Sequence, residues 1–211
     1  MYNLPYFKEM DMNRVLEFMR RHPFIFLTGV DAENKPVCTQ VPVFIDEKDD
    51  KLFLTGHIMR NSDHHKAFGQ NRQVLAVFTG PHVYVSATWY DNPVQASTWN
   101  YMSVHAKGVI RFGDKQELTE VLRRLTLHYE NNNKDSSTVF DNLPSDYTED
   151  LMKAIVSFEI EVKELDNVFK LSQNRNEISY RNIMAELGKG DDDARQIAGE
   201  MEKRINQLFG Q

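Results

Sequence analysis

The feature that most constrains this 211-residue chain is a series of short apolar stretches between residues 24 and 112, separated by turns. Predicted strands cover Phe24–Thr28, Val37–Ile45, Leu52–Thr55, Val74–Thr79, His82–Ala87 and Tyr101–Phe112. Strands Val74–Thr79 and His82–Ala87 are expected to meet across a corner at Gly80-Pro81. Pro42 predicts an edge, a bulge or a bend, because proline has no N–H to donate to a sheet. Short strands joined by turns predict an antiparallel barrel or sandwich and not a parallel α/β sheet.

Helices are predicted before, within and after this run of strands. Residues 11–22 have an apolar helical face, with Asp11 as a cap and Pro23 as a terminator. A short helix is expected near Ser62–Phe68, with Asn61 or Ser62 as its N-cap. Glu117–Tyr129 is amphipathic, and residues 156–162 alternate as a late strand. Two helices are expected at the C-terminal end, the second running from Ala194 to Leu208. The chain is therefore expected to be mainly β with helices, in the α+β class.

Charge and composition exclude several classes of protein. Lys and Arg total 25 against 31 Asp and Glu, a net charge of −6 with no basic stripe, which argues against direct DNA binding. We find no signal-peptide pattern and no apolar run of roughly 18 residues, so we expect a cytoplasmic protein without a membrane span. The single cysteine, Cys38, cannot form an internal disulfide and is predicted to be a buried thiol.

One segment has the residues that a phosphate group needs. Between residues 54 and 66 the chain leaves a strand and enters a short helix, and it carries Thr55, Arg60 and Lys66. A hydroxyl, helix N-terminal amides and two cations suit an anion, although an ordinary solvated loop is an equal interpretation. His57 and the pair His64-His65 suggest a metal, but no further ligand completes a set, and we expect no metal site.

Two aromatic runs could bind a flat ligand. Trp89 and Trp99 flank a proline-containing loop, and Trp99 is followed by Asn100 and Tyr101, which combine aromatic walls with polar groups. Core packing is the alternative for both tryptophans. Dinucleotide-binding, P-loop and serine-hydrolase fingerprints are absent from the sequence.

Several motifs together carry a family resemblance. They are the opening Met-Tyr-x-x-x-Tyr-Phe, Leu54-Thr-Gly-His57, the run from Gly80 to Ser86, Trp89-Tyr90, Thr98-Trp-Asn-Tyr101, Val104-His105 and the run Lys-Leu-Ser-Gln-Asn-Arg over 170–175. The chain resembles the PaiB-type FMN-binding negative transcriptional regulators from its N-terminus to about Leu187. The wider superfamily resembles pyridoxamine-phosphate oxidase, whose split barrel binds FMN between two subunits.

The resemblance implies an antiparallel split β-barrel with C-terminal helices, and a homodimer with FMN as cofactor. It implies a barrel domain over residues 1–165 and a helical extension over 166–211 that packs on the barrel or the partner. The implied cofactor-binding residues are Thr39, Gln40 and Val41 beside the flavin ring; Thr55, Gly56, His57, Arg60, Asn61 and Lys66 toward the phosphate; and Trp99, Asn100, Ser103 and His105, the last two reaching from the partner chain.

The function implied is that of a regulatory flavin-binding module, a negative transcriptional regulator. Without a basic face, such a regulator is expected to act through a protein partner or through flavin chemistry upstream of transcription. The alternatives are a flavin-dependent oxidoreductase and a split barrel that has lost flavin or binds heme. No catalytic residue is predicted. The chain departs from the family pattern at Ser62-Asp63-His64, beside the expected phosphate site.

Overall fold

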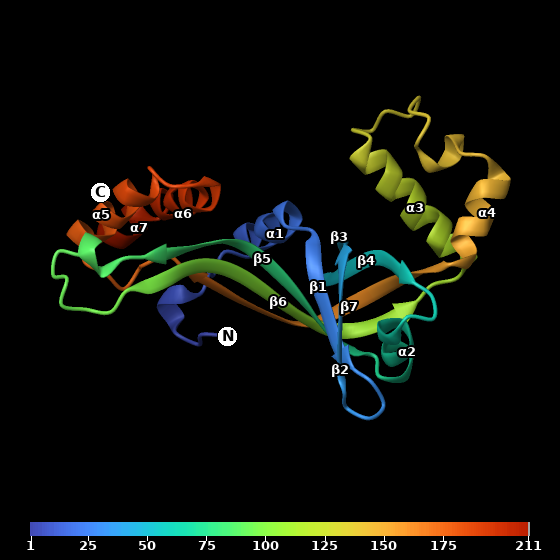
Figure 1. The fold of residues 1–211 in the computed structure, drawn as a ribbon, viewed down its shortest axis with the longest axis horizontal. Coiled ribbons are helices and arrows are strands. Elements are labelled where there is room, and N and C mark those ends of the chain that lie inside the picture. The colour runs from blue at the N-terminus through green and yellow to red at the C-terminus, as the bar shows by residue number, and fades with distance from the viewer. Residues whose placement is uncertain (211) are drawn as a thin grey trace. The chain divides into compact units, whose positions relative to one another are not determined.

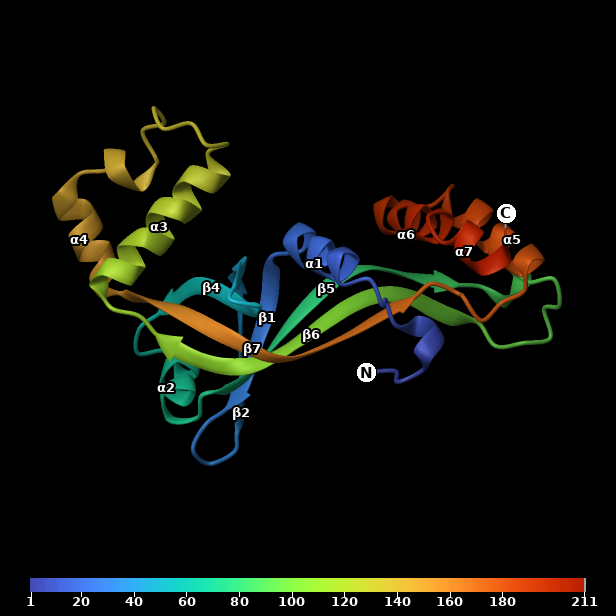
Figure 2. The ribbon, with the colours of Figure 1, turned by 180° about the vertical axis from the view of Figure 1, so that it is seen from behind.

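The computed structural model describes residues 1–210 and contains one seven-stranded antiparallel sheet (Figures 1 and 2). The strands are β1 Phe24–Val30, β2 Pro36–Pro42, β3 Phe44–Lys48, β4 Lys51–Met59, β5 Gln73–Val85, β6 Thr98–Phe112 and β7 Ile155–Lys170. Their order in the sheet is β2-β1-β5-β6-β7-β4-β3. The helices are α1 Met12–Arg21, α2 Asp63–Gln70, α3 Lys115–Tyr129, α4 Ser145–Lys153, α5 Glu177–Leu187, α6 Asp192–Glu202 and α7 Ile205–Phe209. The sheet curls into the predicted split barrel.

The chain forms two compact units. One comprises residues 1–22, 78–104 and 166–211, and is called the terminal unit here; the other comprises residues 23–77 and 105–165, and is called the barrel unit. The long strands β5, β6 and β7 contribute residues to both. The division into a domain over 1–165 and an extension over 166–211 stays a prediction, because compact units need not be separately folding domains. None of the helices within residues 1–210 is long and apolar enough to cross a membrane.

Local pairing organises the barrel unit. Strand β2 pairs with β1 in register from Phe24↔Pro42 to Val30↔Pro36, and β3 pairs with β4 as a hairpin. The chain breaks between β2 and β3 at Pro42, so the predicted single strand over residues 37–45 is wrong and the predicted bend is correct. After the bend, the Val43 N–H donates to the Pro23 carbonyl at 2.9 Å, which replaces the donor that proline lacks.

Strand β5 runs through Gly80-Pro81 without a corner, so the prediction of two strands there is wrong. The glycine has a packing reason. A Cβ at Gly80 would lie 2.5 Å from Cε2 of Phe18, so the absent side chain lets α1 lie directly against the strand in the terminal unit.

The predicted helix starts are confirmed where a local cap sets them. Asp11 accepts from the Asn13 N–H and Ser62 accepts from the His65 N–H. The sequence did not predict helix α4. The single helix predicted at the end of the chain is two helices in the structure, α6 and α7, with Lys203 and Arg204 between them. Cys38 is exposed on β2, so the prediction of a buried thiol is wrong. The cause is that Cys38 alternates with the inward-facing residues of an edge strand.

Candidate functional site

The segment from β4 into α2 is held by its own hydrogen bonds. Asn61 adopts a left-handed conformation with φ 62°, and its N–H donates to Nδ1 of His65 at 3.1 Å. Ser62 then caps the helix, with its hydroxyl accepting from the His65 N–H at 3.3 Å. Asparagine tolerates this backbone conformation better than most residues, so the turn that orients α2 follows from the local sequence.

Three cations on this segment have no carboxylate partner within residues 1–210. They are Arg60, Lys66 and Arg72, whereas most other Lys and Arg side chains of the described chain form ion pairs. Burial lowers the pKa of His65, and the positive charges of Arg60, His64 and Lys66 lower it further. The positive charges of Arg60 and Lys66 therefore act on the same imidazole.

This donor set suits a phosphate. Arg60 and Lys66 provide positive charge and hydrogen-bond donors, and no carboxylate within residues 1–210 already neutralises either side chain. Asp63 is the only opposing charge in the first turn of α2, and hydrogen bonds from the backbone and side chain of His64 lower its pKa. Arg72, two residues beyond the end of α2, was not predicted as a site residue. Its position in the sequence, just after this short helix, is the feature that could have identified it.

Other predicted residues on β4 have different surroundings. Gly56 is buried where β2 passes β4, since a Cβ there would lie 2.8 Å from the Pro42 carbonyl oxygen. His57 is opposite Ser157 of β7, and burial lowers its pKa. Thr55 donates to Oδ2 of Asp46 at 3.2 Å, and Asp46 also accepts two hydrogen bonds from Arg124. Thr55 therefore lies beside a carboxylate rather than beside the cations of α2.

The three predicted residues of β2 face two ways. Thr39 and Val41 pair with Leu27 and Ile25, which are fully buried, so they point toward the barrel interior. Gln40 is exposed and pairs with Phe26, which is 39% exposed. Of these three residues, only Gln40 presents its side chain to the outside.

The remaining predicted residues are mostly in the terminal unit. Asn100 is completely buried, where its amide exchanges hydrogen bonds with the Ser172 hydroxyl at 3.0 and 3.1 Å. Ser103 donates to the Phe78 carbonyl at 3.0 Å. Trp99 is 52% exposed, and its ring lies 5.9 Å from that of Tyr84. His105, in the barrel unit, is half-buried. The geometry gives Asn100 and Ser103 structural roles, and their contact with a cofactor stays a prediction.

The terminal unit also joins three of the sequence motifs around one lysine. Lys170 is 8% exposed, bonds to Thr98 and donates to the Trp99 carbonyl at 2.7 Å. Its ammonium lies 5.6 Å from the centre of the Tyr2 ring, and burial lowers its pKa. Lysine is seldom buried without a carboxylate partner. Here the buried ammonium is stabilised instead by Thr98, the Trp99 carbonyl and the Tyr2 ring, so the motifs at residues 2, 98 and 170 pack around the same charge. Within residues 1–210, no three His, Cys, Asp or Glu residues are grouped to hold a metal ion.

Comparison with known proteins places the chain in a family. Residues 1–164 match the family described as "Putative FMN-binding domain". The chain is 33% identical over 206 residues to "Protease synthase and sporulation protein PAI 2" of Bacillus subtilis (strain 168), which covers 97% of this chain and 98% of that protein.

Solved structures support the fold. A conserved hypothetical protein of Mycobacterium tuberculosis has a TM-score of 0.56 at 12% identity, covering 81% of this chain and 91% of that one. The "FAD and Heme binding protein" of Mycobacterium smegmatis has a TM-score of 0.52 at 12% identity, covering 78% and 73%. Together these matches lead to one conclusion: the chain belongs to the FMN-binding family of PaiB-type split barrels, and its cofactor is FMN.

Proposed function

We propose that this protein is a regulatory flavin-binding module that holds the FMN phosphate with Arg60 and Lys66, helped by Arg72. The observation that carries the proposal is the group of cations around α2 without carboxylate partners in residues 1–210. Bound FMN supplies redox chemistry that accepts or returns one or two electrons. The protein's own residues fix the phosphate end by charge and hydrogen bonds, and the neutral His65 keeps Asn61 in place.

The regulatory part of the proposal rests on similarity. The B. subtilis relative is named for protease synthesis and sporulation, and the sequence motifs resemble those of negative transcriptional regulators. The net charge of −6 opposes contact with DNA through the chain's own surface. We therefore assign it a cytoplasmic role exercised through a protein partner, or through flavin chemistry upstream of transcription.

The proposal includes a homodimer with the flavin at the interface. Gln40 and the backbone of β2 would border the ring in one chain, and Trp99 and His105 would come from the other. Thr55, Gly56 and His57 would lie along β4 beside the rest of the cofactor. Exposed aromatic side chains in both units, including Phe26 and Trp99, suit such an assembly.

The test of the phosphate site is the double variant Arg60→Ala/Lys66→Ala, titrated with FMN by quenching of flavin fluorescence. A hydrogen bond to a charged group is worth roughly 1.5–3 kcal/mol, so affinity should fall at least about tenfold. The matched control is Arg181→Ala/Lys189→Ala, which removes one arginine and one lysine that are exposed and ion-paired on or beside α5. Equal FMN affinity of the double variant and the wild type would refute the assignment.

A second candidate is an electron-transferring enzyme. It is favoured by the fold shared with a protein named for binding FAD and heme. An absorption spectrum of the purified protein separates the candidates: a Soret band favours heme, and flavin bands favour FMN. Rapid reduction of bound FMN by a nicotinamide nucleotide would then favour an oxidoreductase over a regulatory module.

A further inference from the structure

A cavity of about 230 Å³ lies wholly within the terminal unit. The C-terminal halves of α1 and α6 line it together with residues of β5 and β6. None of its lining residues is among those predicted to bind the flavin. The cavity therefore has no role in the proposed function.

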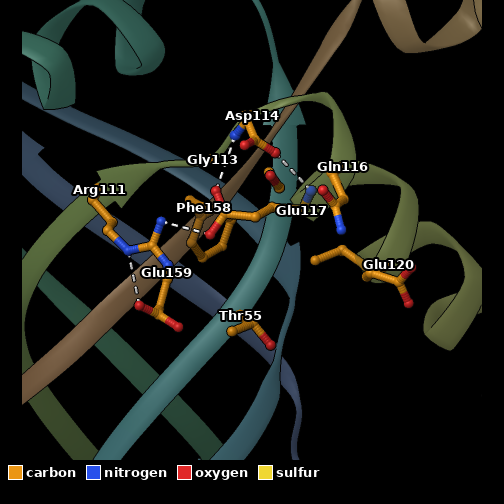
Figure 3. A pocket seen from close by; sticks show the side chains of 11 residues that line it. Thr55, Arg111, Gly113, Asp114, Gln116, Glu117, Glu120, Phe158 and Glu159 are labelled. Carbon is orange, nitrogen blue, oxygen red and sulfur yellow. Dashed lines mark hydrogen bonds and ion pairs between the residues drawn. The ribbon is translucent and has the colours of Figure 1, made fainter.

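A second cavity, of about 260 Å³ in the barrel unit, shows what a wall satisfied by the protein itself looks like (Figure 3). There Arg111 lies between two carboxylates, at 2.8 Å from Glu117 and 2.9 Å from Glu159. Glu120 is paired with Arg123 at 2.6 Å. The charges of that wall are already matched within the described residues, so it indicates no ligand.

The buried part of the terminal-unit cavity is apolar. Phe18 and Met102 are 2% and 5% exposed, and Pro81 is also buried. On the side of α6 the wall includes Gly199, where a Cβ would meet nothing within 4 Å. The bare glycine leaves room for a short hydrocarbon chain.

The exposed rim carries more positive than negative charge. Arg21 and Lys203 line it with a single carboxylate, that of Glu200. Both oxygens of this carboxylate are already engaged, because Lys203 donates to Oε1 at 2.7 Å and the buried Arg204 donates to Oε2 at 2.9 Å. One positive charge of the rim is therefore in excess.

Arg21 has donors to spare. Its guanidinium lies 3.4 Å from Glu17 and 3.7 Å from Glu200, whereas a charge-assisted hydrogen bond measures roughly 2.7–2.9 Å. A guanidinium presents its N–H groups as a planar fork that matches the two oxygens of a carboxylate. The ion pairs of Arg21 within residues 1–210 leave this fork without a close acceptor.

His22 lies next to Arg21 at the end of α1. Its ring packs 4.6 Å from the ring of Phe18 and makes no side-chain hydrogen bond within residues 1–210. Burial and the charge of Arg21 lower the pKa of His22, while Asp193 of α6 opposes them with a smaller effect. The imidazole is therefore neutral near pH 7 and has one N–H with which to donate.

An apolar interior below a cationic rim complements an anion that carries a short hydrocarbon chain. A cation would meet the excess positive charge, and a bare phosphate would leave the apolar wall unfilled. We propose that this cavity binds a short-chain aliphatic carboxylate, held at its head by Arg21 and Lys203 and along its chain by Phe18 and Met102. The site is separate from the proposed flavin-phosphate site and adds a second ligand to the protein.

The probe is sodium butyrate, titrated by calorimetry into the full-length protein saturated with FMN near neutral pH. Butanamide has the same chain without the charge, and acetate has the same charge with two fewer methylenes. Butyrate should bind saturably, about fivefold more tightly than butanamide because solvent screens the rim cations, and about tenfold more tightly than acetate. Absence of saturable butyrate binding, or equal binding of butanamide or acetate, would overturn the proposal.

Rim variants test the cations. Arg21→Gln and Lys203→Gln each remove one positive charge and should weaken butyrate by about fivefold. The matched control is Arg195→Gln, because Arg195 is an equally exposed cation of α6 that pairs with Asp192 outside the cavity. It should keep butyrate affinity within about twofold of wild type. Equal losses in the control and the rim variants would indicate general charge and reject the site.

Gly199→Leu tests the apolar part independently of charge. Leucine favours a helix more than glycine does, so the variant should unfold in urea no earlier than wild type while its side chain fills the cavity. Saturable butyrate binding should be lost, and unchanged affinity would contradict the proposal. The Arg60→Ala/Lys66→Ala variant should keep its butyrate affinity; a loss there would place the anion at the flavin-phosphate site instead. Failure of this proposal is therefore distinguishable from failure of the proposed phosphate site.

Discussion

Arg204 shows how much one residue can hold together within the terminal unit. It is 5% exposed and donates to Glu9 at 2.6 Å, to the carboxylate of Glu200 at 2.9 Å and to the Glu200 carbonyl at 2.8 Å. Burial opposes ionisation of Glu200, but hydrogen bonds from Lys203 and Arg204 outweigh it and lower the pKa of that carboxyl. The N-terminal segment is thereby tied to the end of α6.

Replacing Arg204 by Ala should cost about 3–5 kcal/mol of unfolding free energy, since two mostly buried carboxylates would lose their shared cation. Urea denaturation at neutral pH measures this. Arg195→Ala is the control, because Arg195 is an exposed residue of α6 whose ion pair with Asp192 is solvated and should contribute less than about 1 kcal/mol. Similar midpoints for the two variants would show that the buried network contributes little.

Residue-scale features differ in how far the sequence predicts them. The caps Asp11 and Ser62 were predictable because a cap depends only on its own neighbours along the chain. Arg204 was not, because its charged neighbours in sequence are typical of a solvated helix face, and its partner Glu9 is distant in sequence. The prediction that Cys38 is buried failed for a related reason: an apolar strand pattern does not show which strand lies at the edge of the sheet.

At the scale of elements, the run of short strands and the strand-to-helix entry at α2 follow from the sequence pattern, whereas the breaks between strands do not. Glycine has two uses that look alike in sequence: a turn or a close approach. Gly80-Pro81 suggested a turn, but Gly80 makes room for Phe18. Helix α4 was missed because its cap is Pro144, which makes no side-chain hydrogen bond. In the candidate site, Arg60 and Lys66 could be predicted from the sequence, while the contact of Thr55 with Asp46, which also binds Arg124 of α3, could not, because it depends on packing between distant segments.

The crossing of β2 over β4 should be intolerant of any side chain at Gly56. A Cβ there would lie 2.8 Å from both the Pro42 carbonyl oxygen and Cζ of Phe158. We expect Gly56→Ala to destabilise the protein by about 1–3 kcal/mol through overpacking. Thermal and urea unfolding monitored by circular dichroism would measure the change.

A second glycine provides the control for that variant. Gly69 lies in α2, and a Cβ there would meet nothing closer than 4.0 Å, so Gly69→Ala should stabilise the helix by about 0.5–1 kcal/mol. The two substitutions should therefore change the free energy of unfolding in opposite directions. A neutral or stabilising Gly56→Ala would mean that the crossing relaxes freely.

At the scale of the whole molecule, the homodimer is the part of the proposal that involves the exposed face of β1 and β2. Phe24 and Phe26 are 58% and 39% exposed, and alternate on the outward side of β1 opposite Pro42 and Gln40. Gln40 is also the β2 residue that we propose borders the flavin with its side chain. A dimer that covers this face would therefore bury two phenylalanines from each chain beside the cofactor.

Light scattering coupled to size exclusion should give twice the mass of one chain at micromolar concentration. The variant Phe24→Glu/Phe26→Glu should be monomeric, because each buried phenylalanine contributes roughly 1.5–3 kcal/mol and two-fold symmetry counts each substitution twice. The same variant should lose FMN affinity, since the flavin would lie at the lost interface. Val94→Glu/Ile178→Glu, which alters two exposed apolar residues of the terminal unit, should stay dimeric and keep FMN. A wild-type monomer that binds FMN, or a charged β1 variant that remains a dimer, would place the interface elsewhere or remove it altogether.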